Sequence, residues 1–225
     1  MQFIFKSGYI CCGCGKRYTI EHTNAIFKRS CICNECYSQI EKVPHYSSFP
    51  GTKHCDFVVS PFFYKDLYRD IFLQFKFSGC FAYGHILGMK AAEYFNDFTQ
   101  MRDYDGIVIV PLSKQRLRER GFNQSEIMGK YIAETLDLPI INCVQKVIHT
   151  QTQSNLKGLD RINNVKNSFK ITQSLTDKRI IIFDDIFTTG STINEVARVI
   201  KNAGAKTVCA ITAGYVYHEL KPQLY

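Results

Sequence analysis

The run 180–192 constrains the fold of this chain more than any other part of the sequence. Four large apolar residues, 180–183, predict a buried strand, and Asp184 and Asp185 follow it directly. A loop of small residues then leads into a helical pattern; it reads Thr188, Thr189, Gly190, Ser191, Thr192. A buried strand that passes through such a loop into a helix is typical of α/β proteins, whose ligands bind at the carboxyl edge of a parallel sheet.

The residue types in this run favour a phosphorylated sugar as the ligand. The carboxylates of Asp184 and Asp185 can accept hydrogen bonds from the paired hydroxyls of a ribose and can assist a divalent ion. The small loop offers backbone N–H groups and hydroxyls to a phosphate beside the positive end of a helix, and Gly190 permits a close approach. The alternative is a plain turn whose polar residues only cap the helix, and the length of the whole pattern argues against it.

Strand and helix patterns alternate along the rest of the chain. Strands are expected at 57–59, 106–110, 179–183 and 207–211, and helices at 67–78, 82–95, 127–136 and 193–200. This alternation predicts an α/β fold with a parallel sheet flanked by helices. Aromatic residues of the first helix interleave with Lys65, Arg69 and Lys76, as they do on base-stacking surfaces. A packed helix face with exposed cations has the same pattern, and we favour that second interpretation.

The cysteines gather near the N-terminus, where six of the ten lie between Cys11 and Cys36. Two C-x2-C knuckles, eighteen residues apart, have the spacing of a closed, structural four-cysteine zinc site. The knuckle residues are Cys11, Cys14, Cys33 and Cys36. Other ligands stay open, namely Cys12, Cys31 and His22, and free buried thiols are the alternative to a metal. The remaining cysteines are expected to be core residues; they are Cys55, Cys80, Cys143 and Cys209.

The composition changes after the cysteine segment. A stretch with two prolines and a glycine, 43–53, predicts a linker. We therefore expect a zinc-binding module and linker over 1–55 and a main domain over 56–225. The sequence contains no apolar run of the ~20 residues that a membrane span needs and does not open with a signal peptide, which favours a cytoplasmic protein without membrane insertion.

A net charge of +8 favours anionic partners such as nucleic acids or polyphosphates. Four cations lie close together after the strand at 106–110; they are Lys114, Arg116, Arg118 and Arg120. Guanidinium groups match phosphate oxygens in pairs, so this basic segment can bind a pyrophosphate, or equally a nucleic-acid backbone. A solvated helix face is the third possibility, and all four side chains cannot point inward together.

The run 180–192 resembles the motif with which type I phosphoribosyltransferases bind phosphoribosyl pyrophosphate (PRPP). The segment 111–124 resembles a signature of the ComF family of competence-associated, phosphoribosyltransferase-like proteins. The next block of that family is matched by Gln153, Leu156, Arg161, Asn164, Val165 and Phe169. The order of cysteine knuckles, aromatic helix, basic segment and PRPP motif matches too, so the resemblance covers almost the whole chain. Ile109 departs from it, because many members have a proline there, and we expect no effect on the fold.

The resemblance implies a type I phosphoribosyltransferase fold with a small N-terminal four-cysteine zinc-binding module. In that family the acid pair holds the ribose of PRPP and the following loop holds its 5′-phosphate. Carried over, Asp184 and Asp185 bind the ribose hydroxyls and 188–192 the phosphate, with Mg²⁺ accompanying PRPP. The segment 149–164 lies where type I phosphoribosyltransferases have a mobile loop that closes over the ligand, and a variable surface loop is the alternative.

The implied function is PRPP binding in DNA uptake during natural transformation, with single-stranded DNA and a helicase-type competence protein as partners. One alternative is a nucleobase or nucleotide phosphoribosyltransferase of purine or pyrimidine salvage, which releases pyrophosphate from PRPP. The other is a non-catalytic DNA-binding accessory protein. Asp184 and Asp185 are the candidates for a catalytic role. No residue can be identified from the sequence as a general base for an acceptor.

Overall fold

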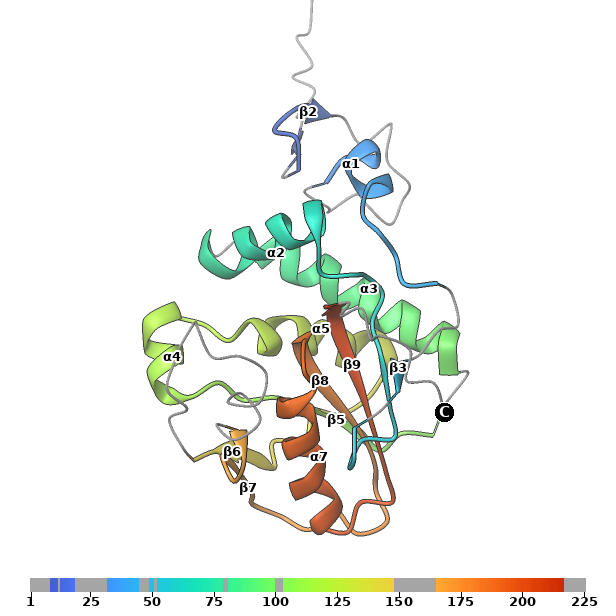
Figure 1. Ribbon diagram of the computed structural model, residues 1–225, viewed down its shortest axis with the longest axis vertical. Coiled ribbons are helices and arrows are strands. Elements are labelled where there is room, and N and C mark those ends of the chain that lie inside the picture. The colour runs from blue at the N-terminus through green and yellow to red at the C-terminus, as the bar shows by residue number, and fades with distance from the viewer. Residues whose placement is uncertain are drawn as a thin grey trace, which may run out of the picture.

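The computed structural model describes residues 9–11, 13–18, 32–44, 49–50, 52–78, 81–99, 103–147 and 165–216. Its main body is a five-stranded sheet with the strand order β3-β4-β9-β8-β5 (Figure 1). The strands are β3 (Phe49–Pro50), β4 (Phe57–Val59), β5 (Gly106–Ile109), β8 (Arg179–Phe187) and β9 (Thr207–Tyr215). Every pairing is parallel except that of the edge strand β3 with β4. The predicted parallel sheet is therefore confirmed, and β3 adds a strand within the stretch expected to be a linker.

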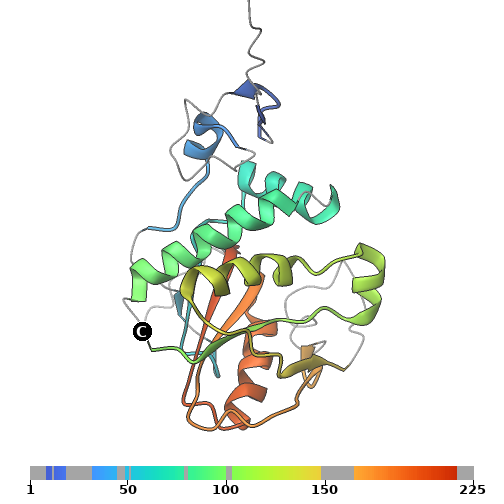
Figure 2. The same cartoon turned by 180° about the vertical axis from the view of Figure 1, so that it is seen from behind.

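Helices cover both faces of this sheet. The helices are α2 (Asp66–Ser78), α3 (Phe81–Thr99), α4 (Lys114–Arg120), α5 (Gln124–Leu136) and α7 (Ser191–Asn202). Helices α3 and α5 lie on one face and α7 on the other, as the two opposite views show (Figures 1 and 2). The predicted helices are thus confirmed, with small differences at their ends.

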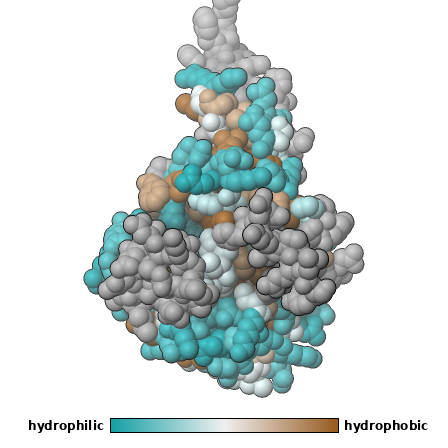
Figure 3. Space-filling view, in the orientation of Figure 1, coloured by the Kyte–Doolittle hydropathy of each residue, from teal (hydrophilic) through white to brown (hydrophobic). Residues whose placement is uncertain are grey.

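Strand β8 explains why two layers of helices are needed. Ile181 and Phe183 belong to the core on the α3–α5 side, whereas Ile180 and Ile182 belong to the core on the α7 side. Successive side chains of a strand point to opposite faces, so an uninterrupted apolar run must be covered on both. The buried residues of α7 lie on one side of that helix, and Figure 3 shows its outer face as hydrophilic.

The aromatic residues around α2 lie inside the protein. Four of them, Phe62, Tyr68, Phe72 and Phe75, are at most 3% exposed, and Phe77 is 75% exposed. The packed-helix interpretation is therefore confirmed for these four side chains, because a ring must be accessible to stack on a base. Among the helices of the described ranges, none is both long and apolar enough to cross a membrane.

The cysteine segment packs against the main domain. It contains β1 (Tyr9–Ile10), β2 (Arg17–Tyr18) and the short helix α1 (Asn34–Ser38), which lies beyond α2 (Figure 1). Cys36 and Ile40 share one hydrophobic cluster with Ile71 and Leu87, which come from α2 and α3. The first domain of the chain thus has no separate core within the described residues.

Candidate functional site

A step in the sheet exposes the acid pair. β5 pairs with β8 only as far as Ile109 opposite Phe183, and the Val110 N–H makes the next bond, to the Phe183 carbonyl at 2.9 Å. β8 continues beside β9 up to Phe187. Asp184 and Asp185 therefore lie within the strand rather than after it, on a stretch that has β9 on one side and no β5 on the other. This step lies at the carboxyl edge of the sheet, where ligands of such folds bind.

The environment of Asp184 disfavours its charge. Burial raises the pKa of Asp184 to about 8, and the neighbouring charge of Asp185 acts in the same direction. The Ser125 hydroxyl, at the start of α5, donates to Asp184 Oδ1 at 3.5 Å, and the Asp185 N–H donates to the same oxygen at 2.9 Å. Two lysines, Lys146 and Lys76, partly offset the effect on the pKa. Hydroxyl donors or a cation would stabilise the charged form of such a pair.

Lys76 and Lys146 are site residues that the sequence did not indicate. Lys76 comes from the end of α2, and Lys146 from β6 (Val144–Lys146), which pairs with β7 (Phe169–Ile171). Burial lowers the pKa of each lysine, and the carboxylate of Asp184 acts in the opposite direction on both. No local pattern links them to the acid pair. Lys76 stands out only among the cations of the aromatic helix, and the fold carries each lysine to the acid pair from a distant element.

The basic segment forms the helix α4. The Ser113 hydroxyl caps α4 by accepting the Arg116 N–H at 3.3 Å, and Gly121 ends it with φ of 76°. Residues four apart share a helix face, so the segment presents two pairs of cations in different directions. Lys114 and Arg118 are exposed, and Arg116 and Arg120 are half-buried.

The half-buried pair of α4 lies near Lys76, one of the two lysines beside the acid pair. Both Arg116 and Arg120 lower the pKa of Lys76 through their charge, so the three cations lie close to one another. Arg120 Nη1 also donates to Gln124 Oε1 at 3.2 Å, and Gln124 Nε2 donates to the Lys76 carbonyl at 3.4 Å. These bonds join α4, α5 and α2 around the site. The result is a cluster of positive charge next to two carboxylates, which matches a ligand that carries both phosphates and hydroxyls.

The small-residue loop lies beside Asp184. A cleft of ≈ 190 Å³ lies at this edge of the sheet and is lined by Asp184, Thr188, Gly190, Ser191 and Thr192. A second cleft, with about 390 Å³ of empty space, lies elsewhere, under α1. Thr189 is exposed, and its hydroxyl lies 2.7 Å from that of Ser191. The cleft at the sheet edge is the relevant one, because it joins a carboxylate to the N-terminus of α7, where backbone N–H groups favour an anion.

Gly190 is required where it stands. Its φ is 72°, in the left-handed region, and it caps α7. A Cβ at this position would lie 2.7 Å from Phe187 Cζ and 2.9 Å from Thr52 Cγ2. Both the backbone conformation and the space therefore exclude a side chain.

The four knuckle cysteines converge. The sulfur atoms of Cys11, Cys14, Cys33 and Cys36 all lie within 4.8 Å of one another. Cys14 Sγ and Cys33 Sγ are 3.9 Å apart, and a tetrahedral zinc with Zn–S bonds of about 2.3 Å requires sulfur separations of about 3.8 Å. The donor set and its dimensions fit zinc.

Backbone N–H groups surround one of these sulfurs. The N–H groups of Gly13 and Cys33 each donate to Cys11 Sγ at 3.3 Å. Burial raises the pKa of this thiol, but these hydrogen bonds outweigh it and bring the pKa to about 7. The alternative ligands Cys12, Cys31 and His22 lie outside the described residues, as does the expected mobile loop 149–164. Cys55, Cys143 and Cys209 are buried, as expected, and Cys80 also lies outside the described residues.

Comparison with known proteins adds a family assignment. Residues 124–223 match the model of the phosphoribosyl transferase domain. Competence protein F of Haemophilus influenzae is 34% identical over 113 residues, 48% of this chain and 49% of the relative, so the chain spans about half the length of that protein. Competence protein ComFC of Streptococcus pneumoniae is 27% identical over 197 residues, 80% of this chain and 85% of the relative.

Two further comparisons cover less or align less well. DNA utilization protein YhgH of Escherichia coli is 35% identical over 105 residues, which is 46% of each chain. Among solved structures, a purine phosphoribosyltransferase from Pyrococcus horikoshii aligns with 60% of this chain and 83% of its own, at 21% identity. The TM-score of this alignment is 0.36.

Proposed function

This chain is a ComF-type, phosphoribosyltransferase-like protein, and from that premise we propose that it binds PRPP with Mg²⁺ at the step between β5 and β8. One observation carries the proposal: the half-buried Asp184 and the glycine-capped N-terminus of α7 line the same cleft at the edge of the sheet. Asp184 and Asp185 accept hydrogen bonds from the ribose hydroxyls. The loop 188–192 binds the 5′-phosphate through backbone N–H groups and hydroxyls.

The cluster of cations near the acid pair provides the groups that would bind the pyrophosphate of PRPP. Arg116, Lys76 and Lys146 are half-buried, and their mutual repulsion is relieved when an anion lies between them. Lys114 and Arg118, on the exposed side of α4, contribute to the attraction of the ligand and not to its direct contacts. Mg²⁺ bound with PRPP neutralises pyrophosphate oxygens, and its preference for oxygen ligands is compatible with the two carboxylates.

We assign the biological role to DNA uptake in natural transformation. Support comes from the relatives, which carry the names competence protein and DNA utilization protein. Because Tyr68, Phe72 and Phe75 of α2 are packed inside the protein, we place any contact with single-stranded DNA on the exposed cations Lys114 and Arg118. The cysteine module, held by zinc, is the element proposed to dock a helicase-type competence protein.

The first experiment is calorimetric titration of the full chain with PRPP, with and without Mg²⁺, and then with short single-stranded DNA. We expect saturable PRPP binding that strengthens with Mg²⁺. The double variant Asp184→Asn, Asp185→Asn should fold normally and lose PRPP binding, because each amide lacks the negative charge and presents an NH2 donor in place of the second acceptor oxygen. The matched control is Asp177→Asn, an exposed acid that precedes the opposite end of β8.

Two results contradict the proposal. If the double variant binds PRPP as tightly as the wild type, the ribose assignment is wrong. If the wild type binds DNA in a salt-sensitive way and does not bind PRPP, the fold serves only as a scaffold for a DNA-binding protein.

A further inference from the structure

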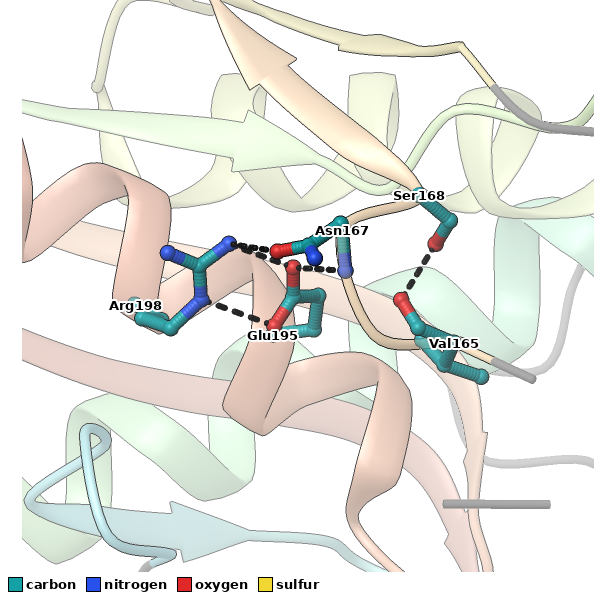
Figure 4. Close-up of polar contacts among 5 residues, drawn as sticks. All are labelled: Val165, Asn167, Ser168, Glu195 and Arg198. Carbon is teal, nitrogen blue, oxygen red and sulfur yellow. Dashed lines mark hydrogen bonds and ion pairs between the residues drawn. The ribbon is translucent and has the colours of Figure 1, made fainter. Parts of the chain in front are cut away.

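A second polar cluster lies on α7, one turn beyond the loop 188–192, which we call the phosphate loop. Glu195 is 5% exposed, and both of its oxygens are paired (Figure 4). The Asn167 N–H donates to Glu195 Oε1 at 2.7 Å. Arg198 donates from Nη2 to Oε1 at 2.7 Å and from Nε to Oε2 at 2.9 Å, and its Nη2 also reaches Asn167 Oδ1 at 3.3 Å. We call these three residues the Glu195 clamp.

The clamp holds a turn that leads into β7. Asn167 has a φ of 59°, in the left-handed region that asparagine tolerates better than most residues with a side chain. Next to it, the Ser168 hydroxyl and N–H donate to the Val165 carbonyl at 2.6 and 3.1 Å (Figure 4). The buried carboxylate thus fastens a tight turn to α7 through a backbone N–H group.

This turn supports the hairpin that carries Lys146. In the β6–β7 register, Lys146 is opposite Phe169, and the Val147 N–H donates to the Ser168 carbonyl at 2.8 Å. The Lys146 amine lies 5.2 Å from the centre of the Phe169 ring. The hairpin forms its own two-stranded sheet, separate from the main one, and an isolated two-stranded hairpin is marginally stable at best. It therefore needs an attachment elsewhere, and the Glu195 clamp is one.

We propose that Glu195 is a positioning residue, which fixes the β6–β7 hairpin to α7 so that Lys146 stays beside Asp184 and contacts an anionic oxygen of the bound ligand. The same helix begins with the phosphate loop, so the clamp also sets the separation between that loop and Lys146. This inference deepens the proposed function and rests on it for the identity of the ligand. Burying a carboxylate costs free energy unless its oxygens are fully paired. Here the partners of Glu195 connect the helix that begins with the phosphate loop to the hairpin that carries Lys146.

The test is a double-mutant cycle on PRPP affinity, measured by calorimetry with Mg²⁺. We expect Lys146→Met to weaken binding by about tenfold or more, and Glu195→Gln to weaken it by about fivefold to tenfold in the wild-type background. In the Lys146→Met background, Glu195→Gln should change affinity by less than about twofold, because the residue that it positions is gone. Equal losses in both backgrounds would overturn the proposal.

Two matched variants separate positioning from loss of an ion pair. Glu93→Gln on α3 breaks another (i, i+3) pair, Lys90 to Glu93 at 2.6 Å, and should leave affinity unchanged. Asn167→Gly keeps the left-handed backbone and the N–H bond to Glu195 but removes Oδ1, so affinity should stay within about twofold. A loss in Asn167→Gly as large as that in Glu195→Gln would contradict the assigned role of the backbone N–H.

A ligand-free measurement keeps this inference distinct from the proposed function. Amide hydrogen exchange of Val147, whose N–H bonds to Ser168, should be at least about tenfold faster in Glu195→Gln than in the wild type. The N–H groups of β9 serve as the internal reference for global stability. Unchanged exchange at Val147 would refute the clamp even if PRPP binds, and faster exchange would support it even if PRPP does not.

Discussion

Asp184 on β8 pairs in register with Thr212 on β9, and the Thr212 hydroxyl is buried without a hydrogen-bond partner in the described part of the chain. A buried hydroxyl that makes no hydrogen bond costs free energy. We expect Thr212→Val, which keeps the branched shape, to raise the free energy of unfolding by about 1 kcal/mol in urea titrations. Thr172→Val is a contrasting variant: Thr172 is exposed and its hydroxyl donates to the Cys143 carbonyl at 3.1 Å, so the substitution should not stabilise the protein. Destabilisation by Thr212→Val would show that the hydroxyl is paired.

The raised pKa of Asp184 predicts a pH dependence of stability. The folded protein holds a proton on this carboxyl more tightly than the unfolded chain, so stability falls as the pH rises from the unfolded value to about 8. The variant Asp184→Asn cannot ionise and avoids this loss. Its free energy of unfolding should exceed that of the wild type by at least about 1 kcal/mol near pH 9, and by less near pH 5. Urea unfolding at both pH values, without ligand, measures this; an advantage that does not grow with pH contradicts it.

The two directions of α4 predict unequal roles for its arginines. Arg116→Gln should weaken PRPP binding by about tenfold, because a half-buried guanidinium near Lys76 contacts the pyrophosphate directly. Arg118→Gln removes the same charge from the exposed side and should weaken binding by less than about twofold. Calorimetry at one ionic strength compares the two. Equal losses would mean that α4 acts only through its net charge.

Two glycines with left-handed backbones separate conformational strain from crowding. Gly121 has a φ of 76°, and a Cβ there would meet none of the described residues beyond its chain neighbours within 4 Å, whereas a Cβ on Gly190 meets Phe187 and Thr52. We expect Gly121→Ala to lower the free energy of unfolding by about 1 kcal/mol and Gly190→Ala by about 2–3 kcal/mol. PRPP affinity should fall only in Gly190→Ala. Equal costs in urea titrations would show that the phosphate loop relaxes freely.

Removal of metal should affect more than the cysteine module. Since Cys36 and Ile40 share a hydrophobic cluster with α2 and α3, loss of zinc should expose part of that cluster. We expect about one zinc per chain by elemental analysis, and a thermal midpoint at least about 4 °C lower after chelation or in Cys33→Ser. Cys143→Ala, a buried thiol outside the module, should retain the metal. If chelation leaves the thermal midpoint of the sheet domain unchanged, the cysteine module is energetically independent of that domain.

The regular elements could be predicted because each has its own period. The apolar run 180–183 and the helical spacing after Gly190 were sufficient for a strand and a helix, and they correspond to β8 and α7. The end of β8 could not be predicted, because the strand continues to Phe187 only where β9 pairs with it. Pairing between strands that are distant in the chain leaves no local pattern.

The candidate site was predicted in part for the same reason. The acid pair and the phosphate loop are adjacent in sequence, so their proximity follows directly. The sequence shows four cations in the basic segment, but it does not show which face of α4 packs against the protein. That packing alone makes Arg116 half-buried and leaves Arg118 exposed. Lys76 and Lys146 reach the acid pair from α2 and β6, and only tertiary packing brings them together.

The central position of β9 has a consequence for how the protein is made. This strand lies between β4 and β8, yet it is the last element of the described chain to leave the ribosome. Until residues 207–215 emerge, β4 and β8 have no partner between them, and both present open edges. Pairing across so long a stretch of chain is slow, and open strand edges aggregate, so truncation before β9 should leave an insoluble fragment and not a smaller folded domain.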